Sequence, residues 1–157
     1  DSVHGIIPAP LVKYEQGPDS TGPVMNGERT PDENLYGRTT VVNDMHTRKH
    51  MMAKEVLAGG PGSGFIALPG GFGTLEELME IVTWNQLGIH SSGIVVLNVD
   101  GYWNGLLDWV KGGVDVGFVP EGNENIIIEA KSGDEAVKAL RGYKVSKGRF
   151  MLQWGNE

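Results

Sequence analysis

The chain of 157 residues contains no cysteine. Disulfides, thiolate nucleophiles and cysteine-ligated zinc sites are therefore excluded within it, and this composition suits a reducing cytosol. No apolar run approaches the roughly 20 residues of a membrane-spanning helix. Residues 1–15 also lack the basic and then apolar layout of a signal peptide. We therefore expect a cytoplasmic protein without a membrane partner.

Basic residues are scarce as well, since 13 Lys and Arg stand against 20 Asp and Glu, a formal net charge of −7. The electric field of this negative net charge repels a long nucleic acid, so we expect no nucleic-acid partner. Any anionic ligand must therefore be held by local groups. Hydrophobic residues at 39% and charged residues at 21% are ordinary for a globular protein. The length is that of one compact domain, for which we expect a single core.

Short apolar runs alternate with amphipathic stretches along most of the chain. This alternation predicts an α/β protein with a doubly wound parallel sheet, whose ligand site lies beyond the carboxyl ends of the strands. Residues 10–38, which are rich in proline and glycine, instead predict a long loop. The predicted strands are residues 3–7, 39–42, 65–68, 94–99 and 126–128, and the predicted helices are residues 45–57, 74–88, 102–116 and 132–141.

Several side chains have predicted roles within these elements. Asp44 is placed to cap the helix at 45–57, and a Ser-x-x-Glu box begins the helix at 132–141. The strand at 65–68 is apolar throughout, so both of its faces should be covered. In the helix at 74–88 apolar residues recur at i, i+3, i+4 and i+7. They predict an inward-facing stripe that consists of Leu75, Leu78, Met79 and Val82.

The most informative segment is LPGGFGTLEE at residues 68–77, where a predicted strand passes through a glycine-rich turn into a helix. Backbone N–H groups and the positive end of the helix dipole can hold a phosphate there. No lysine follows Gly73 and the GxGxxG spacing is absent, so a monophosphate suits the loop better than a triphosphate or a dinucleotide. Alternatively, Thr74 and Glu77 form a Thr-x-x-Glu capping box and the glycines only make a tight turn. The residues by themselves leave both interpretations open.

The MHTRKH segment at residues 45–50 places Arg48 and Lys49 in the first turns of a predicted helix, where the helix dipole disfavours cations. That placement indicates an anionic partner; the alternative is a solvated surface. His46 and His50 are four residues apart but lack an obvious third ligand, so we expect no metal site. The sequence also offers no recognisable lysine site for pyridoxal phosphate.

Together, MHTRK at 45–49 and PGGFGTLEE at 69–77 resemble the paired MHxRK and PGGxGTxxE motifs of the cytokinin-activating "lonely guy" phosphoribohydrolases. Many members of that family carry the older label "lysine decarboxylase-like". The resemblance runs from residue 3 to about residue 140 and includes TWNQLGIH at 83–90 and LNVDGY at 97–102. It implies a Rossmann-like fold and hydrolysis of the N-glycosidic bond of a cytokinin riboside 5′-monophosphate. It also implies that no cofactor is needed and that the enzyme works as a homodimer or larger homo-oligomer.

The same resemblance implies roles for the motif residues. The catalytic pair of the family is the arginine of MHxRK and the glutamate that closes PGGxGTxxE, here Arg48 and Glu77. A carboxylate at that place can stabilise an oxocarbenium-like transition state and orient water, while the arginine would bind the phosphate or the departing base. The implied substrate- and phosphate-binding residues are Met45, Lys49, Gly70, Gly71, Phe72, Gly73 and Thr74.

The family has a further strand–helix–strand–helix segment in front, and this chain opens after it. We therefore expect an N-terminally incomplete hydrolase domain at 1–142, a tail at 143–157, and weak or no activity from these residues alone. Two other functions stay open. One is a general nucleosidase acting on AMP and other nucleoside 5′-monophosphates, since the motifs address ribose phosphate and not the prenyl group. The other is a nucleotide-binding module without catalysis.

Overall fold

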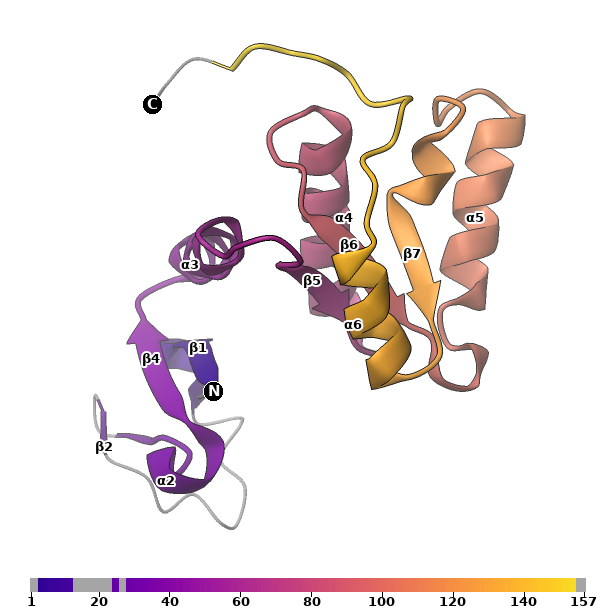
Figure 1. The fold of residues 1–157 in the computed structure, drawn as a ribbon. Helices are drawn as coiled ribbons and strands as arrows, with labels where there is room; N and C mark the ends of the chain where they lie inside the picture. The colour runs from indigo at the N-terminus through magenta and orange to yellow at the C-terminus, as the bar shows by residue number, and fades with distance from the viewer. Residues whose placement is uncertain (1–2, 13–23, 26–27, 155–157) are drawn as a thin grey trace. The chain divides into compact units, whose positions relative to one another are not determined.

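The computed structural model describes residues 3–12, 24–25 and 28–154 (Figure 1). The chain divides into two compact units, Asp1–Glu55 and Val56–Glu157, each with its own parallel sheet. Strands and helices alternate along the second unit, and the parallel pairing in both units confirms the predicted Rossmann-like α/β class. Within the described residues, no helix combines the length and apolar character needed to cross a membrane.

The first unit is built on two parallel strands, β1 (His4–Pro8) and β4 (Arg38–Val42). Helix α3 (Met45–Leu57) follows β4 with the predicted bounds, and both strands lie within one residue of their predicted positions. A hydrogen bond of 2.8 Å between His4 Nε2 and Thr40 Oγ1 joins side chains of the two strands. The β-branched and apolar residues of these strands thus form the sheet that their pattern predicted.

The prediction of one long loop at residues 10–38 was wrong for the described part of that segment. Short elements held by local hydrogen bonds form there, and such elements leave no apolar periodicity in the sequence. In one of them, Asp32 accepts a hydrogen bond from the Asn34 N–H and caps a one-turn helix. Residues 13–23 and 26–27 of the predicted loop lie outside the described part. The short elements are α1 (Ala9–Val12), the antiparallel pair β2 (Val24–Met25) and β3 (Glu28–Arg29), and α2 (Glu33–Tyr36).

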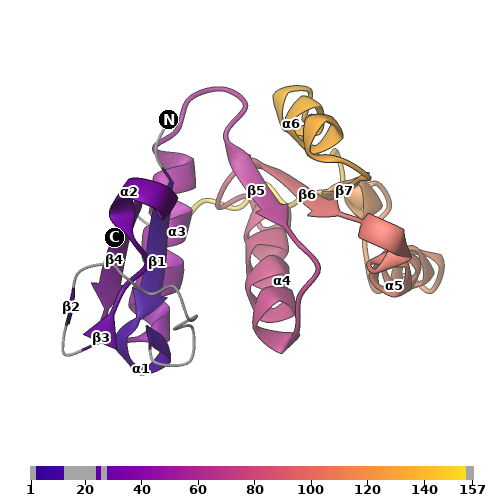
Figure 2. The same ribbon diagram turned by 90° about the horizontal axis from the view of Figure 1, so that it is seen from below.

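The second unit contains three parallel strands in the order β5–β6–β7, with helices on both faces (Figure 2). Helices α4 and α5 cover one face and α6 covers the other, which is the doubly wound arrangement. The strands are β5 (Gly64–Ala67), β6 (Gly93–Leu97) and β7 (Ile127–Ala130). The helices are α4 (Phe72–Gln86), α5 (Asn104–Asp115) and α6 (Gly133–Arg141), with single 3-10 turns η1 (Val99–Gly101) and η2 (Asn123–Asn125).

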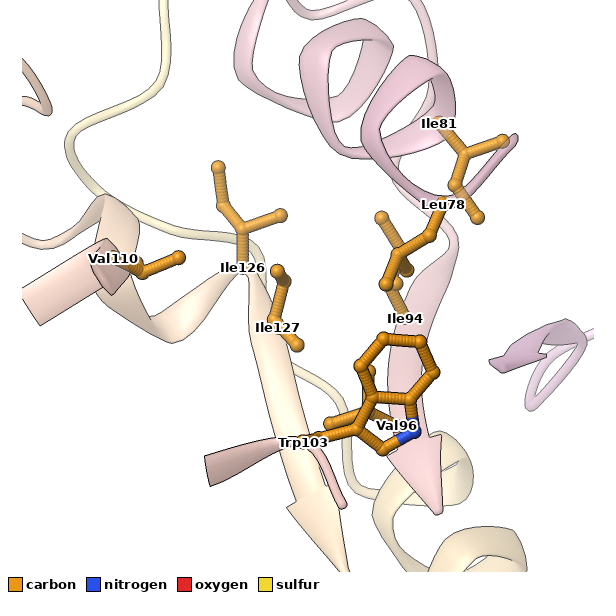
Figure 3. Close-up of a cluster of buried hydrophobic side chains, with 8 residues drawn as sticks. All are labelled: Leu78, Ile81, Ile94, Val96, Trp103, Val110, Ile126 and Ile127. Carbon is orange, nitrogen blue, oxygen red and sulfur yellow. The ribbon is translucent and has the colours of Figure 1, made fainter. Parts of the chain in front are cut away.

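The main core of this unit lies between the sheet and helices α4 and α5 (Figure 3). Ile94, Val95 and Val96 of β6 have no exposed surface, as expected for the central strand of a parallel sheet. Val95 faces α6 instead and packs with Ala130 and Ala136. The eight buried side chains of the main core are Leu78, Ile81, Ile94, Val96, Trp103, Val110, Ile126 and Ile127.

Two predicted side-chain directions were wrong. Leu75 is 37% exposed, because it lies in the first turn of α4 beside the glycine-rich turn at residues 69–73, here called the glycine loop. The buried face of the helix begins at Leu78. Ile66 of β5 is 40% exposed. Phe65 and Ala67 point to the main core, whereas Ile66 points to the opposite face, where α6 packs over β6 and β7.

The chain after α6 runs past the carboxyl end of α4. The Phe150 N–H donates to the Gln86 carbonyl at 2.8 Å, and Trp154 Nε1 donates to the Leu87 carbonyl at 3.1 Å. These bonds satisfy carbonyl groups that the end of a helix leaves unpaired. The predicted division into a domain at 1–142 and a tail at 143–157 stays a prediction.

Candidate functional site

The glycine loop leads from β5 into a helix terminus that no side chain caps. Gly71 is the N-cap residue of α4 and has an extended backbone. The first backbone bond of the helix runs from the Leu75 N–H to the Gly71 carbonyl at 3.1 Å. The N–H groups that precede Leu75 therefore lie at an uncapped helix terminus, a place that favours anions.

The capping-box interpretation of Thr74 and Glu77 was wrong. A capping box needs its threonine at the N-cap, but α4 begins at Phe72, so Thr74 lies inside the first turn. The Thr74 hydroxyl instead lies close to Gly70, where an added Cβ would stand 2.2 Å from Thr74 Oγ1. The glycine at position 70 thus permits a close approach of the loop to the helix.

Glu77 lies one turn further along α4 than Thr74. Residues three apart share a helix face, so Glu77, which is half-buried, lies on the side of α4 that carries Thr74. Its neighbour Glu76 is exposed. At the start of the helix the side chain of Phe72 is 95% exposed. The second unit therefore groups an anion-binding terminus, a hydroxyl and a carboxylate on one short segment.

The second set of predicted residues lies in the first two turns of α3. The Asp44 carboxylate accepts hydrogen bonds from the Thr47 N–H and hydroxyl, both at 2.8 Å, which confirms the predicted cap. These bonds from Thr47, with a smaller contribution from His46, lower the pKa of Asp44 below its ordinary value. The carboxylate is therefore held in its charged form at the positive end of the helix.

Arg48 is tied to the middle of β1, since its Nε donates to the Ile6 carbonyl at 3.1 Å. The side chain is half-buried, as is that of Lys49, whereas Met45 is 40% exposed. Arg48 and Lys49 are thus packed along much of their length, which argues against the solvated surface considered above. The first unit brings Met45, Arg48 and Lys49 together on α3, and the second unit brings Gly70, Gly71, Phe72, Gly73, Thr74 and Glu77 together.

One contact at the loop could not be found from the sequence. The Tyr102 hydroxyl donates a hydrogen bond to the Gly70 carbonyl and so joins the segment after β6 to the glycine loop. From the sequence, Tyr102 is only the first residue of the helix predicted at 102–116, and no pattern in the sequence pairs it with Gly70. Among the described residues, no group of three or more His, Asp or Glu side chains is arranged to hold a metal.

Comparisons with known proteins place both motifs in one family. A family described as "Possible lysine decarboxylase" matches residues 1–140. The chain is 46% identical over 156 residues to a "Bifunctional cytokinin biosynthesis protein" of Fusarium pseudograminearum, a match that covers 98% of this chain and 31% of that protein. It is 48% identical over 141 residues to a cytokinin riboside 5′-monophosphate phosphoribohydrolase of Arabidopsis thaliana, with 90% and 56% covered.

Another Arabidopsis thaliana protein of the same name is 42% identical over 157 residues, with 96% of this chain and 60% of the relative covered. The chain thus spans between 31% and 60% of the length of these relatives. The family match extends over β1 to α6 and includes both motifs. The chain therefore belongs to the "Possible lysine decarboxylase" family, which is the "lonely guy" phosphoribohydrolase family whose motifs it resembles.

Proposed function

We propose that the protein hydrolyses the N-glycosidic bond of cytokinin riboside 5′-monophosphates and releases the free cytokinin base and ribose 5-phosphate. Relatives at 42% and 48% identity are named for this activity. The observation that carries the proposal is the uncapped terminus of α4, with Glu77 in the second turn of the same helix. It supplies an anion site and a carboxylate on one helix, which are the two groups that a nucleoside monophosphate hydrolase needs.

In the proposed reaction the 5′-phosphate binds the loop and helix N–H groups of Gly70, Gly71 and Gly73 and the Thr74 hydroxyl. As the C1′–N bond breaks, its electron pair leaves with the base, which takes up a proton. Positive charge develops on the ribose, and the Glu77 carboxylate stabilises that charge and orients the attacking water. The water oxygen bonds to C1′ and its proton is released, so that ribose 5-phosphate is formed.

The residues of α3 bind the substrate in this proposal. The guanidinium of Arg48 is planar and always charged, which suits contact with the phosphate or with the departing base. The Nε bond to the Ile6 carbonyl fixes one edge of the guanidinium and so limits its rotation. Met45 and Lys49 of α3 and the exposed ring of Phe72 complete the proposed set of substrate contacts.

Glu77→Gln tests the catalytic carboxylate, with Glu76→Gln as the matched control in the next position. In the full-length protein, we expect Glu77→Gln to lower kcat for base release from isopentenyladenosine monophosphate by about 10²- to 10⁴-fold. Glu76→Gln should stay within about twofold of wild type, because Glu76 is exposed. Unchanged turnover in Glu77→Gln would point to another catalytic residue. A wild-type protein that binds nucleotides but releases no base would favour the non-catalytic module.

Arg48→Ala tests the proposed substrate contact, and Lys54→Ala is its control because Lys54 is an exposed cation of the same helix. Loss of a charge-assisted hydrogen bond to the substrate should lower kcat/KM by at least about tenfold. Lys54→Ala should leave kcat/KM within about twofold. Equal losses in the two variants would show that the general positive charge of α3, and not Arg48 itself, is what matters.

The general nucleosidase remains the alternative, because phosphate and ribose are common to all nucleoside monophosphates. The ratio of kcat/KM for isopentenyladenosine monophosphate and AMP separates the two proposals. A ratio of about ten or more supports a pocket that recognises the prenyl group, since burial of several methylene groups is worth at least that much. A ratio near one supports the general enzyme. Release of carbon dioxide from lysine would contradict both.

We also propose, from the family resemblance, that the protein works in the cytosol as a homodimer or larger homo-oligomer. The absence of cysteine suits that compartment. Large apolar side chains that are mostly exposed, among them Phe118 at 88% and Met151 at 85%, suit coverage by another copy. Light scattering of the full-length protein tests the assembly, and a monomeric mass at micromolar concentration would contradict it.

A further inference from the structure

We propose that Tyr102 is a positioning residue that holds the glycine loop in its phosphate-binding conformation, an inference that rests on the proposed function. The Tyr102 hydroxyl donates its hydrogen bond to the Gly70 carbonyl. Tyr102 follows β6 and Gly70 follows β5, and these strands are neighbours in the parallel sheet. The bond therefore joins two neighbouring loops at the carboxyl edge of the sheet, and the segment after β6 holds the glycine loop after β5.

Trp103, the residue that follows Tyr102, is held by a hydrogen-bond network around Asn98. The side chain of Asn98, which is 4% exposed, accepts the Trp103 N–H at 2.7 Å and donates to Glu129 and Asn104, both at 2.8 Å. The Tyr102 ring meets the ring of Trp103 edge-on, with centroids 5.1 Å apart and an interplanar angle of 89°. Because Trp103 is 4% exposed, this contact attaches the tyrosine to the main core.

The backbone before Tyr102 has an uncommon conformation. Asp100 has φ 51°, and the residue after it, Gly101, has φ 76°. A non-glycine residue with positive φ is uncommon and persists only where the surroundings determine it. A side chain at Gly101 would also place its Cβ 2.8 Å from Asn104 Nδ2. The turn thus aims the tyrosine at the glycine loop at some conformational cost.

The bond to Gly70 matters because of peptide geometry. The Gly70 carbonyl and the Gly71 N–H belong to one planar trans peptide and point in opposite directions. A hydroxyl that holds the carbonyl therefore also directs the Gly71 N–H away from Tyr102, at the entrance to α4. Two consecutive glycines otherwise allow this peptide to rotate, since neither has a Cβ that restricts it. The bond thus selects one loop conformation before the phosphate arrives.

Tyr102→Phe in the full-length protein tests this role by calorimetric titration with ribose 5-phosphate and, separately, with isopentenyladenine. We expect the phosphate ligand to bind about tenfold more weakly, because one charge-assisted bond from the loop is lost or misdirected. Binding of the base should change by less than about twofold. The melting temperature should stay within about 2 °C, since the ring and its contact with Trp103 remain. The control is Tyr36→Phe, which removes the hydroxyl of an exposed tyrosine on α2.

Gly101→Ala is the second variant, since it should displace Tyr102 and reproduce the selective loss of ribose 5-phosphate binding. Tyr102→Phe that binds ribose 5-phosphate as tightly as wild type overturns the inference. Equal weakening of both ligands also overturns it, because that indicates general disruption of the site. A wild-type protein that binds ribose 5-phosphate but hydrolyses no nucleotide refutes the proposed function alone, and the same titrations still decide the role of Tyr102.

Discussion

At the scale of single residues, a close contact, and not a positive φ, requires glycine at position 70. An ideal Cβ on Gly70 would lie 2.2 Å from Thr74 Oγ1 and 2.9 Å from Thr74 Cβ, so backbone or side chain would have to move. Gly73 lies three residues later, in the first turn of α4, and has no atom within 4 Å of its ideal Cβ position. The two glycines therefore have different physical roles.

This difference predicts opposite effects of alanine. Gly70→Ala should lower the free energy of unfolding by about 1–3 kcal/mol through overpacking. Gly73→Ala should raise it by about 0.5–1 kcal/mol, because alanine favours the helix. Urea unfolding followed by tryptophan fluorescence measures both. Equal stability of Gly70→Ala and wild type would show that the Thr74 side chain turns aside without cost.

Sequence patterns predicted residue roles where the interaction is local. The Asp44 cap and the box in which the Ser132 hydroxyl accepts the Glu135 N–H at 3.3 Å both join residues three apart. The bond from Tyr102 to Gly70 joins residues 32 apart, and no local period encodes it. The alternative in which Thr74 caps the helix was wrong because the pattern placed the helix start two residues too late, and boundaries are the weakest part of such predictions.

At the scale of elements, apolar periodicity predicted the strands and helices that bury one or two faces. It did not predict the short elements at residues 9–36, which have almost no buried face to mark them. It also could not show that α6 packs over β6 and β7 while Ile66 of β5 stays 40% exposed, because coverage depends on the arrangement of the helices. Periodicity thus identifies elements more reliably than it identifies their neighbours.

The connection between α4 and β6 depends on a neutral histidine. His90 is 5% exposed, its Nε2 donates to the Ile81 carbonyl at 2.8 Å and its Nδ1 accepts the Ser92 N–H at 3.2 Å. A second proton, placed on Nδ1, would point at the Ser92 N–H, which is also a donor, and this hydrogen bond would be lost. Burial, and to a smaller extent the charge of Arg149, lowers the pKa of His90 below its ordinary value of 6.5.

A lowered histidine pKa makes the fold less stable in acid. Above about pH 6.5 His90 is neutral in both states and has no effect on the pH dependence. As the pH falls below 6.5, the unfolded state takes up a proton before the folded state does, so stability drops by up to about 1.4 kcal/mol per pH unit until the folded pKa is reached. Urea midpoints between pH 7 and pH 5 should show this drop, and His90→Asn should reduce it. His50→Asn, which changes an exposed residue of α3, should leave this drop in stability unchanged.

At the scale of the whole molecule, the two units differ in the size of their cores. In the described part of Asp1–Glu55 the buried apolar side chains are Val12, Val42 and Ala53. The unit Val56–Glu157 has a cluster of eight buried side chains on one face of its sheet and a second cluster on the other. Because a small core stabilises a fold weakly, we expect the first unit to unfold at a lower urea concentration than the second.

The tryptophans allow this prediction to be tested, since all four, Trp84, Trp103, Trp109 and Trp154, lie in the second unit. Far-UV circular dichroism, which reports on both units, should begin to change at a lower urea concentration than tryptophan fluorescence. Val42→Ala should shift only the early transition and Val96→Ala only the late one, each by about 1–3 kcal/mol, because each removes buried methyl groups from one core. Coincident transitions, shifted together by either variant, would mean that the two units unfold as one cooperative structure.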